Sequence, residues 1–132
     1  MNHGNPVKYL VETDVILAHL MSDKNDTQSH LLGLMKSGIC YTTVVNAAEL
    51  LFIAKSENEK SAITDVLTAF KILGLNSRYS LSVNEFKDKV KSVRDALIAV
   101  VAQYNNLPVV TGNSKRYSRT NLNIIHPKEI RG

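Results

Sequence analysis

Three acidic sites in this sequence share one unusual setting, because each lies in or directly beside an apolar segment that folding would bury. The sites are Glu12 with Asp14, Glu49, and Asp95. An unpaired buried carboxylate is costly, so each site needs a partner that offsets its charge. Three such sites in one short chain predict convergence on a shared cation. Because Mg²⁺ and Mn²⁺ prefer carboxylate oxygens as ligands, a divalent metal ion is the obvious candidate.

A metal ion held by carboxylates is suited to the hydrolysis of phosphodiester bonds, because it lowers the pKa of a bound water and neutralises charge in the transition state. Other residues suit a phosphate as well. The hydroxyls of Thr43 and Thr111 stand at the ends of predicted strands, and a basic segment over residues 115–119 contains Tyr117, which could stack on a base. A second basic run, residues 87–94, could track a nucleic-acid backbone or form a solvated helix face.

Each acidic residue also has a structural interpretation that the sequence leaves open. Glu49 could lie on the narrow polar side of an amphipathic helix, beside Asn46. Asp95 could stabilise the start of a helix through the helix macrodipole, and Asp14 could cap another helix. Glu12 is harder to explain in this way, since it ends a predicted buried strand.

The composition is that of an ordinary globular protein, with 44% hydrophobic residues and a mean hydropathy of -0.09 over 132 residues. We expect one domain over residues 1–132. The formal net charge of +4 is compatible with a polyanionic partner. The single cysteine, Cys40, can form no internal disulfide and is expected in the core. No segment approaches the roughly 18 apolar residues of a membrane span, and the polar start is no signal peptide, so we expect a cytoplasmic protein.

The elements that must position the acidic sites alternate between short apolar strands and helices. Strands are predicted over residues 8–11, 39–42, 108–111 and 124–125, and a further short strand is possible within 75–81. Helices are predicted over residues 15–20, 26–37, 44–55, 84–91 and 95–104, with one more running from a cap at Ser56 or Asn58 to about Leu73. Thr43 is expected to cap the helix over 44–55, and Gly38 to end the helix over 26–37 as a C′ glycine.

This alternation predicts an α/β fold with three α/β/α layers, in which helices cover both faces of a central, mainly parallel sheet. In such sheets, ligand sites form beyond the carboxyl ends of the strands. Residues 12–14, Thr43 and residues 111–113 all follow predicted strands, and Asp95 opens the helix before the strand over 108–111. We therefore expect the acidic sites to meet at one edge of the sheet.

Four segments, in order and over nearly the whole chain, resemble the sequence patterns of PIN domains, in particular those of VapC-type toxins from prokaryotic toxin–antitoxin pairs. Residues 9–17 resemble the family's start, in which apolar residues flank D-T-N, and residues 41–50 resemble its S-x-x-x-x-x-E-L segment. Residues 95–99 resemble its D-x-x-I-A helix, and residues 109–117 its T-x-[DN]-x-x-x-F strand and loop. The resemblance implies a PIN fold and a Mg²⁺- or Mn²⁺-dependent endoribonuclease.

The resemblance also assigns roles to individual positions. Glu49 and Asp95 fall on the second and third acidic metal ligands, Asn113 on a fourth position that can hold a metal-bound water, and Thr111 on the hydroxyl that supports it. At the first acidic position Glu12 replaces the usual aspartate, and Asp14 stands where asparagine or serine is usual, so either or both could be the ligand. The expected catalytic residues are Glu12, Asp14, Thr43, Glu49, Asp95, Thr111 and Asn113, of which the four carboxylates would bind the metal.

Partners follow from the same resemblance: an RNA substrate, a second copy in a homodimer, and an antitoxin whose C-terminal segment enters the acidic cleft, often with an arginine. The change to Glu12, and asparagine at position 113, leave open a PIN-like module that binds RNA or protein with little or no catalysis. A receiver-like signalling domain also gathers acids around Mg²⁺. However, the second predicted strand ends in Thr42 and Thr43 rather than in a phosphoacceptor aspartate, and the expected lysine after the last strand is missing.

Overall fold

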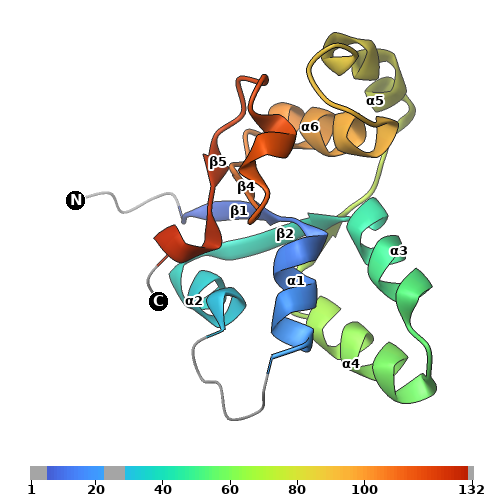
Figure 1. The fold of residues 1–132 in the computed structure, drawn as a ribbon, viewed down its shortest axis with the longest axis vertical. Helices are drawn as coiled ribbons and strands as arrows, with labels where there is room; N and C mark the ends of the chain where they lie inside the picture. The colour runs from blue at the N-terminus through green and yellow to red at the C-terminus, as the bar shows by residue number, and fades with distance from the viewer. Residues whose placement is uncertain (1–5, 23–28, 131–132) are drawn as a thin grey trace.

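A computed structural model describes residues 6–22 and 29–130 of the chain (Figure 1). Its centre is a five-stranded parallel sheet in the order β3-β2-β1-β4-β5. The strands are β1 (Lys8–Val11), β2 (Ile39–Thr43), β3 (Lys71–Leu73), β4 (Val109–Val110) and β5 (Ile124–Ile125). The first strand of the chain is therefore the central one, and Leu10 pairs with Tyr41 on one side and Val109 on the other.

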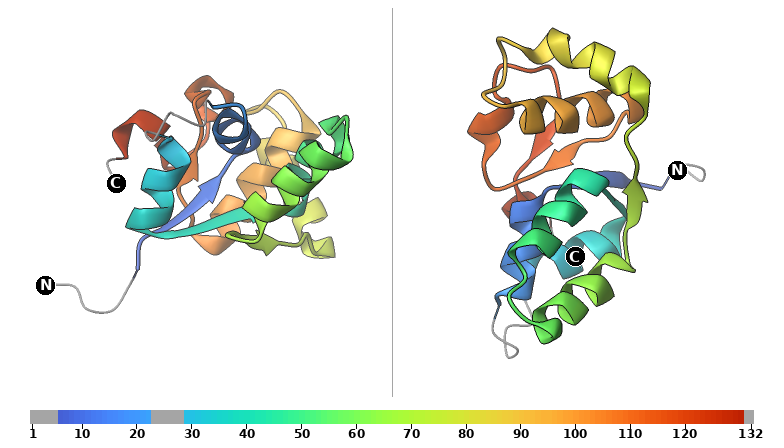
Figure 2. Two further views of the ribbon diagram at one scale, coloured as in Figure 1. Left: turned by 90° about the horizontal axis from the view of Figure 1, so that it is seen from below. Right: turned by 90° about the vertical axis from the view of Figure 1, so that its right-hand side faces the viewer.

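Six α-helices and three 3-10 helices accompany the strands within the described residues. The α-helices are α1 (Thr13–Leu20), α2 (His30–Ser37), α3 (Val44–Ile53), α4 (Glu57–Leu67), α5 (Ser77–Ser82) and α6 (Val93–Asn105). The 3-10 helices are η1 (Val83–Phe86), η2 (Ser114–Tyr117) and η3 (Pro127–Glu129). Helices α1 to α4 lie on one side of the sheet, and α5 and α6 lie on the other (Figures 1 and 2).

The predicted three-layer α/β/α arrangement is confirmed, and it follows from the alternation of side chains along β1. Tyr9 and Val11 point into a core shared with α1, α2 and α4, whereas Leu10 points into a second core built mainly by α6. Cys40 of β2 lies in the first core, where burial raises the pKa of its thiol to about 11. In the part of the chain that the structure describes, no helix is long and apolar enough to span a membrane.

The predicted helix from Ser56 or Asn58 to about Leu73 is wrong beyond Leu67. Ser56 does cap α4, but the helix ends at Leu67, and the chain then forms β3 at the edge of the sheet. The stripe of apolar residues is compatible with both outcomes, and pairing with β2 decides in favour of a strand. The possible strand within 75–81 is likewise wrong, because Asn76 caps the short helix α5 there.

Two other predicted helices are shorter than expected. Residues 84–91 form only the end of η1 followed by turns, and α2 begins at His30, while residues 26–28 of that prediction lie outside the described residues. Gly38 ends α2 as predicted, but not as a left-handed C′ glycine, because its φ of -172° is extended. Glycine is required there by space: a Cβ would lie 2.5 Å from the carbonyl oxygen of Val7.

Candidate active site

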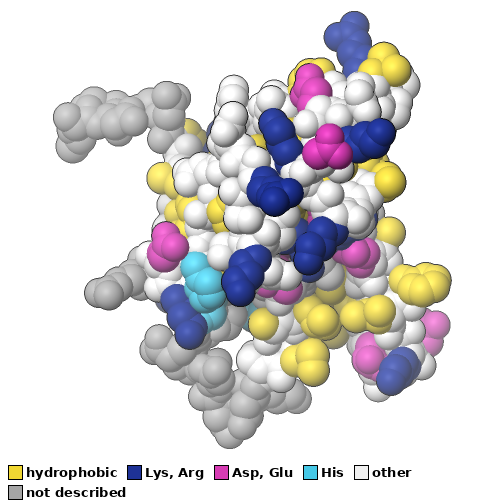
Figure 3. All heavy atoms as spheres, turned by 45° about the horizontal axis from the view of Figure 1, so that its top comes forward, with side chains coloured by type: hydrophobic (Ala, Val, Ile, Leu, Met, Phe, Trp, Pro, Cys, Tyr) yellow, Lys and Arg dark blue, Asp and Glu magenta, His cyan; other side chains and the backbone are white. Residues whose placement is uncertain are grey.

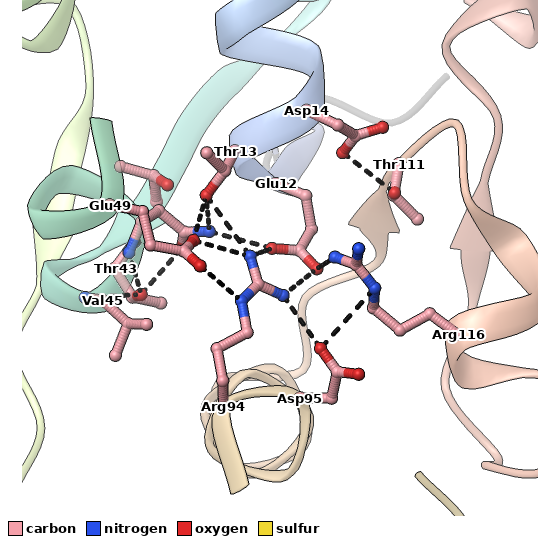
Figure 4. Close-up of polar contacts among 12 residues, drawn as sticks. Glu12, Thr13, Asp14, Thr43, Val45, Glu49, Arg94, Asp95, Thr111 and Arg116 are labelled. Atoms are coloured by element: carbon pink, nitrogen blue, oxygen red, sulfur yellow. Dashed lines mark hydrogen bonds and ion pairs between the residues drawn. The ribbon is translucent and has the colours of Figure 1, made fainter. Parts of the chain in front are cut away.

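Three of the predicted acidic residues meet at the carboxyl edge of the sheet, and each comes from a different element. Glu12 follows β1 and stands at the N-terminus of α1, Glu49 lies in the middle of α3, and Asp95 lies in the first turn of α6 (Figure 4). Glu12 is completely buried and Asp95 is nearly so, whereas the side chain of Glu49 is 38% exposed. We call these three residues the acidic cluster.

The cation on which the acidic cluster converges is the guanidinium of Arg94. Its Nη1 and Nη2 atoms donate to the two carboxylate oxygens of Glu12 at 2.7 and 2.6 Å. Its Nε and Nη2 atoms donate to the two oxygens of Glu49 at 3.1 and 2.8 Å, and Nη1 also lies 3.1 Å from Asp95 Oδ1. Arg94 thus pairs in a bidentate manner with two carboxylates at once, which is the strongest geometry available to a guanidinium.

A second arginine, Arg116 of η2, closes the cluster on the opposite side. Its Nη1 atom lies 3.2 Å from Glu12 Oε2, and its Nε atom lies 3.6 Å from Asp95 Oδ1 (Figure 4). Three carboxylates facing two guanidinium groups leave one negative charge in excess. The cluster is therefore nearly neutralised by side chains of the same chain.

Glu12 is the most heavily bonded member of the cluster. Besides the two arginines, Asn46 Nδ2 donates to its Oε1 at 2.9 Å, and the Tyr117 hydroxyl donates a short hydrogen bond to its Oε2. Burial alone would raise the pKa of Glu12, but the hydrogen bonds and charge of Arg94, together with Tyr117 and Asn46, hold it below its ordinary value of 4.5. Glu12 is consequently a buried anion whose two oxygens are filled with donors.

Neighbouring side chains share this electrostatic setting. Hydrogen bonds from Arg94 lower the pKa of Glu49, against the opposing effect of burial, and the Thr13 hydroxyl assists at 2.6 Å from Glu49 Oε1. Burial and the charge of Glu12 raise the pKa of Tyr117, so its hydroxyl stays protonated and acts as a donor. Burial would lower the pKa of Arg94, but Glu49 and Glu12 raise it. These shifts keep Glu12 and Glu49 ionised, Arg94 charged and Tyr117 protonated, as their contacts require.

Asp14 does not join the acidic cluster. One of its carboxylate oxygens accepts the Thr111 hydroxyl at 3.0 Å, and the other accepts the backbone N–H of Gly112 at 2.7 Å. It lies inside the first turn of α1 rather than at the N-cap, which is Glu12, so its predicted capping role is wrong. Asp14 instead ties α1 to the loop that follows β4.

The two remaining predicted residues beside this loop and α3 serve local structure. Thr43 caps α3 as predicted, and its hydroxyl donates to Asn46 Oδ1 at 2.7 Å, which turns the Asn46 amide nitrogen toward Glu12. Asn113 is exposed, and its backbone N–H donates to the Thr111 hydroxyl at 3.1 Å. Thr43 thus acts on the cluster through Asn46, while Asn113 stands beside the cluster at the surface.

Five residues that bond to the acidic cluster are absent from the predicted set: Thr13, Asn46, Arg94, Arg116 and Tyr117. The suggestion that Tyr117 stacks on a base is wrong, because its side chain is 1% exposed and packs in the core with α6. Arg94 neither lies on a solvated helix face nor is free to track a nucleic-acid backbone, because its side chain turns into the acidic cluster. One available signal was the position of Arg94 directly before Asp95.

Two grooves meet at the cluster. One lies over the arginines between α1, α3 and α6, with Thr13, Leu17 and Ile53 in its walls. The other is basic, and its lining includes Lys89, Lys91, Lys115, Arg116 and Arg119, together with Asp95 and Asn113. Lys and Arg side chains gather near the middle of the face shown in Figure 3, with hydrophobic side chains beside them. Both grooves share Asp95 and Arg116, so the basic groove leads directly to the acidic cluster.

The acidic cluster fits a divalent metal ion in the type of its donors, but the carboxylates are turned to the arginines. Glu12, Glu49 and Asp95 offer the oxygen ligands that Mg²⁺ and Mn²⁺ prefer. Within residues 6–22 and 29–130, however, no three Asp, Glu, His or Cys side chains converge as a ready set of metal ligands. The guanidinium of Arg94 lies between them instead.

Comparison with known proteins places the chain in a family. The model of the PIN domain matches residues 9–121, most of the chain, and the protein therefore belongs to the PIN domain family. Among curated proteins no sequence matches this chain significantly.

Solved structures show the same fold at low sequence identity. VapBC2 from Rickettsia felis, bound to a promoter DNA fragment, has a chain with 20% identity and a TM-score of 0.76, covering 91% of this chain and 98% of its own. A toxin–antitoxin complex from Klebsiella pneumoniae gives 15% identity and a TM-score of 0.74, with 90% and 97% covered. VapBC-1 from nontypeable Haemophilus influenzae has a chain with 22% identity and a TM-score of 0.73. The match covers 92% of this chain and 99% of that chain.

Proposed function

We propose that this protein is an endoribonuclease that hydrolyses RNA phosphodiester bonds at the acidic cluster, and that it is the toxin of a toxin–antitoxin pair. One observation carries the proposal: the basic groove meets the groove over the acidic cluster at Asp95 and Arg116, which line both. An RNA backbone in that groove would bring a phosphate beside the carboxylates. Membership of the PIN domain family, and a fold shared with chains of toxin–antitoxin complexes, support the assignment.

The basic groove supplies the affinity for RNA in this proposal. Its lysines and arginines would pair with successive phosphates and release the counterions that those phosphates hold. Binding should therefore weaken steeply with salt and depend little on base sequence. Tyr117 adds no base stacking, because it is buried.

Catalysis in this proposal uses Mg²⁺ or Mn²⁺. Glu12, Glu49 and Asp95 would hold the ion, and Asn113 stands beside the acidic cluster. When bound, such an ion activates water and offsets charge on the phosphate. Thr43 contributes by orienting Asn46 against Glu12, and Asp14 with Thr111 by fixing the loop that carries Asn113. Arg116, which lines both grooves, is placed to pair with a substrate phosphate.

The test is cleavage of RNA by the purified protein with Mn²⁺ or Mg²⁺, beside EDTA. Glu49→Gln should reduce cleavage by about 100-fold or more, because it removes a charged ligand. Glu57→Gln is the matched control, since Glu57 is an exposed carboxylate in the first turn of α4, and it should cleave like the unchanged chain. Cleavage by Glu49→Gln at the normal rate and with normal metal dependence would refute the assignment of the site.

A second candidate function is an RNA- or protein-binding module without catalysis, and the filled oxygens of Glu12 favour it. A carboxylate that accepts bonds from Arg94, Arg116, Tyr117 and Asn46 has little capacity left for a metal. This alternative predicts salt-sensitive RNA binding that is indifferent to EDTA and yields no cleavage products. The same cleavage assay, accompanied by an RNA-binding titration, separates the two functions.

The proposed partners are a cognate antitoxin and a second copy of the chain. Leu51, Phe52 and Ile53 at the end of α3 are 40%, 90% and 47% exposed, and Ile53 borders the groove over Arg94. We propose that the antitoxin covers this apolar strip. Burial of the strip away from water would favour binding. Co-expression with the product of a neighbouring small open reading frame should give a stable complex that Phe52→Ser weakens. Light scattering on the purified chain alone tests the homodimer.

A further inference from the structure

We propose that Arg94 is an internal cation that competes with divalent metal ions for Glu12 and Glu49, so that the metal-free chain keeps its candidate active site closed. The role of this site as a nuclease centre rests on the proposed function. Arg94 would regulate that same site. A metal ion would then enter the acidic cluster of the metal-free chain only as the Arg94 guanidinium withdraws.

The hydrogen bonds that Glu12 accepts leave its carboxylate no free position for a metal ion. A carboxylate offers about four lone-pair positions. Glu12 already accepts two bonds from Arg94 and one each from Arg116, Tyr117 and Asn46. A metal ion that binds Glu12 must therefore displace at least one of these donors.

Burial identifies the donors that can leave. Asn46 is completely buried and Tyr117 nearly so, and both are fixed by packing, whereas the side chains of Arg94 and Arg116 are 22% and 28% exposed. Arg94 provides two of the five bonds to Glu12 and also covers Glu49. Its withdrawal would therefore free oxygens on two carboxylates in a single movement.

The place of Arg94 in the chain favours an exchange of this kind. It is the second residue of α6, where the positive end of the helix macrodipole disfavours a cation. Its contacts with the carboxylates offset that repulsion, so a divalent ion that replaces these contacts also removes the reason for the guanidinium to stay. The groove over the cluster, walled by Thr13, Leu17 and Ile53, gives the side chain an open path.

Isothermal titration with Mn²⁺ on the full chain tests the proposal without using RNA. Arg94→Gln should bind Mn²⁺ about tenfold or more tightly than the unchanged chain, because a unit positive charge leaves the vicinity of the ion. Arg94→Lys keeps the charge but loses the bidentate fork, and its affinity should fall between the two. Arg78→Gln is the matched control, because Arg78 is exposed on α5, and it should bind Mn²⁺ like the unchanged chain. Equal affinities for the unchanged chain and Arg94→Gln would overturn the proposal.

A second measurement needs no substitution at Arg94. In nuclear magnetic resonance of the metal-free chain, the Nε–H of Arg94 should exchange with water far more slowly than that of Arg78, because it donates to Glu49. Saturating Mg²⁺ should move this resonance and speed its exchange. Exchange as fast as that of Arg78 before metal is added would overturn the proposal. Because neither experiment reads RNA cleavage, failure of this inference and failure of the proposed nuclease activity are distinguishable.

Discussion

Glu12 is the residue at which this chain departs most clearly from the PIN domain pattern, and the structure pairs that departure with another. The pattern has an aspartate where this chain has Glu12, and a phenylalanine where it has Tyr117. The Tyr117 hydroxyl donates to the Glu12 carboxylate, so the two changes lie in direct contact. A buried glutamate is tolerated here because its oxygens are filled by donors from three other elements.

The lowered pKa values of Glu12 and Glu49 predict a specific sensitivity to acid. A carboxyl whose pKa is lower in the folded than in the unfolded chain adds stability above its unfolded value, ordinarily 4.5, and loses that contribution as the pH falls through the folded value. The free energy of unfolding should therefore drop steeply below about pH 4.5. Urea denaturation at a series of pH values measures this dependence.

Arg94→Gln should flatten the same dependence, because both carboxylates lose their main cation and burial then raises the pKa of Glu12. The variant should also be less stable than the unchanged chain near neutral pH, where the buried carboxylate is charged. Arg78→Gln should retain the steep slope of the unchanged chain. A variant at Arg94 with that same steep slope would show that Arg94 does not hold these pKa values down.

At this scale the sequence predicts which carboxylates gather, but not what balances them. Acidic residues set in apolar segments stand out because burial makes them costly, and three of the four meet in one cluster. Arg94 and Arg116 do not stand out, because arginine is common on solvated surfaces and its long side chain can turn either way. Only the packing of α1, α3, α6 and η2 determines that both turn inward.

Helix α3 carries Glu49 and Asn46, and its start is fixed by Thr43. Thr43→Ala should destabilise the fold by about 2 kcal/mol, because it removes the cap and also the hydroxyl that holds Asn46 in place. Ser56→Ala on α4 is the matched control. It removes an exposed cap whose hydroxyl accepts from the backbone N–H of Glu59, and should cost about 1 kcal/mol or less. Thermal or urea denaturation of both variants gives the comparison, and equal losses would deny Thr43 its role in positioning Asn46.

Elements with a strong local signal are predicted well from the sequence, whereas the edge strand β3 is not. β1 and the capped start of α3 are predicted with correct bounds, because a short apolar run and a Thr cap are local features. The strand β3 lies within a segment whose apolar spacing also suits a helix, and only its pairing with β2 determines the outcome. The error has little effect on the site, since β3 lies at the sheet edge and contributes no residue to the acidic cluster.

At the scale of the whole molecule, residues 6–22 and 29–130 contain two hydrophobic cores, one on each face of the sheet, and we propose that they form one domain. Tyr9 and Val11 belong to one core and Leu10 to the other, so neither core can unfold without disturbing β1. We expect a single cooperative transition in which circular dichroism and fluorescence of the tyrosines, present in both cores, coincide. Two separate transitions would instead show that the two cores are independent units.

The reactivity of the Cys40 thiol can report on opening of the central sheet. Cys40 is 4% exposed in β2, where it lies opposite Tyr9 of the central strand, and burial raises the pKa of its thiol to about 11. Alkylating reagents attack the thiolate, so the closed sheet protects this cysteine both by excluding the reagent and by keeping the proton in place. The rate at which Cys40 is alkylated in the native protein therefore measures how often the central sheet opens.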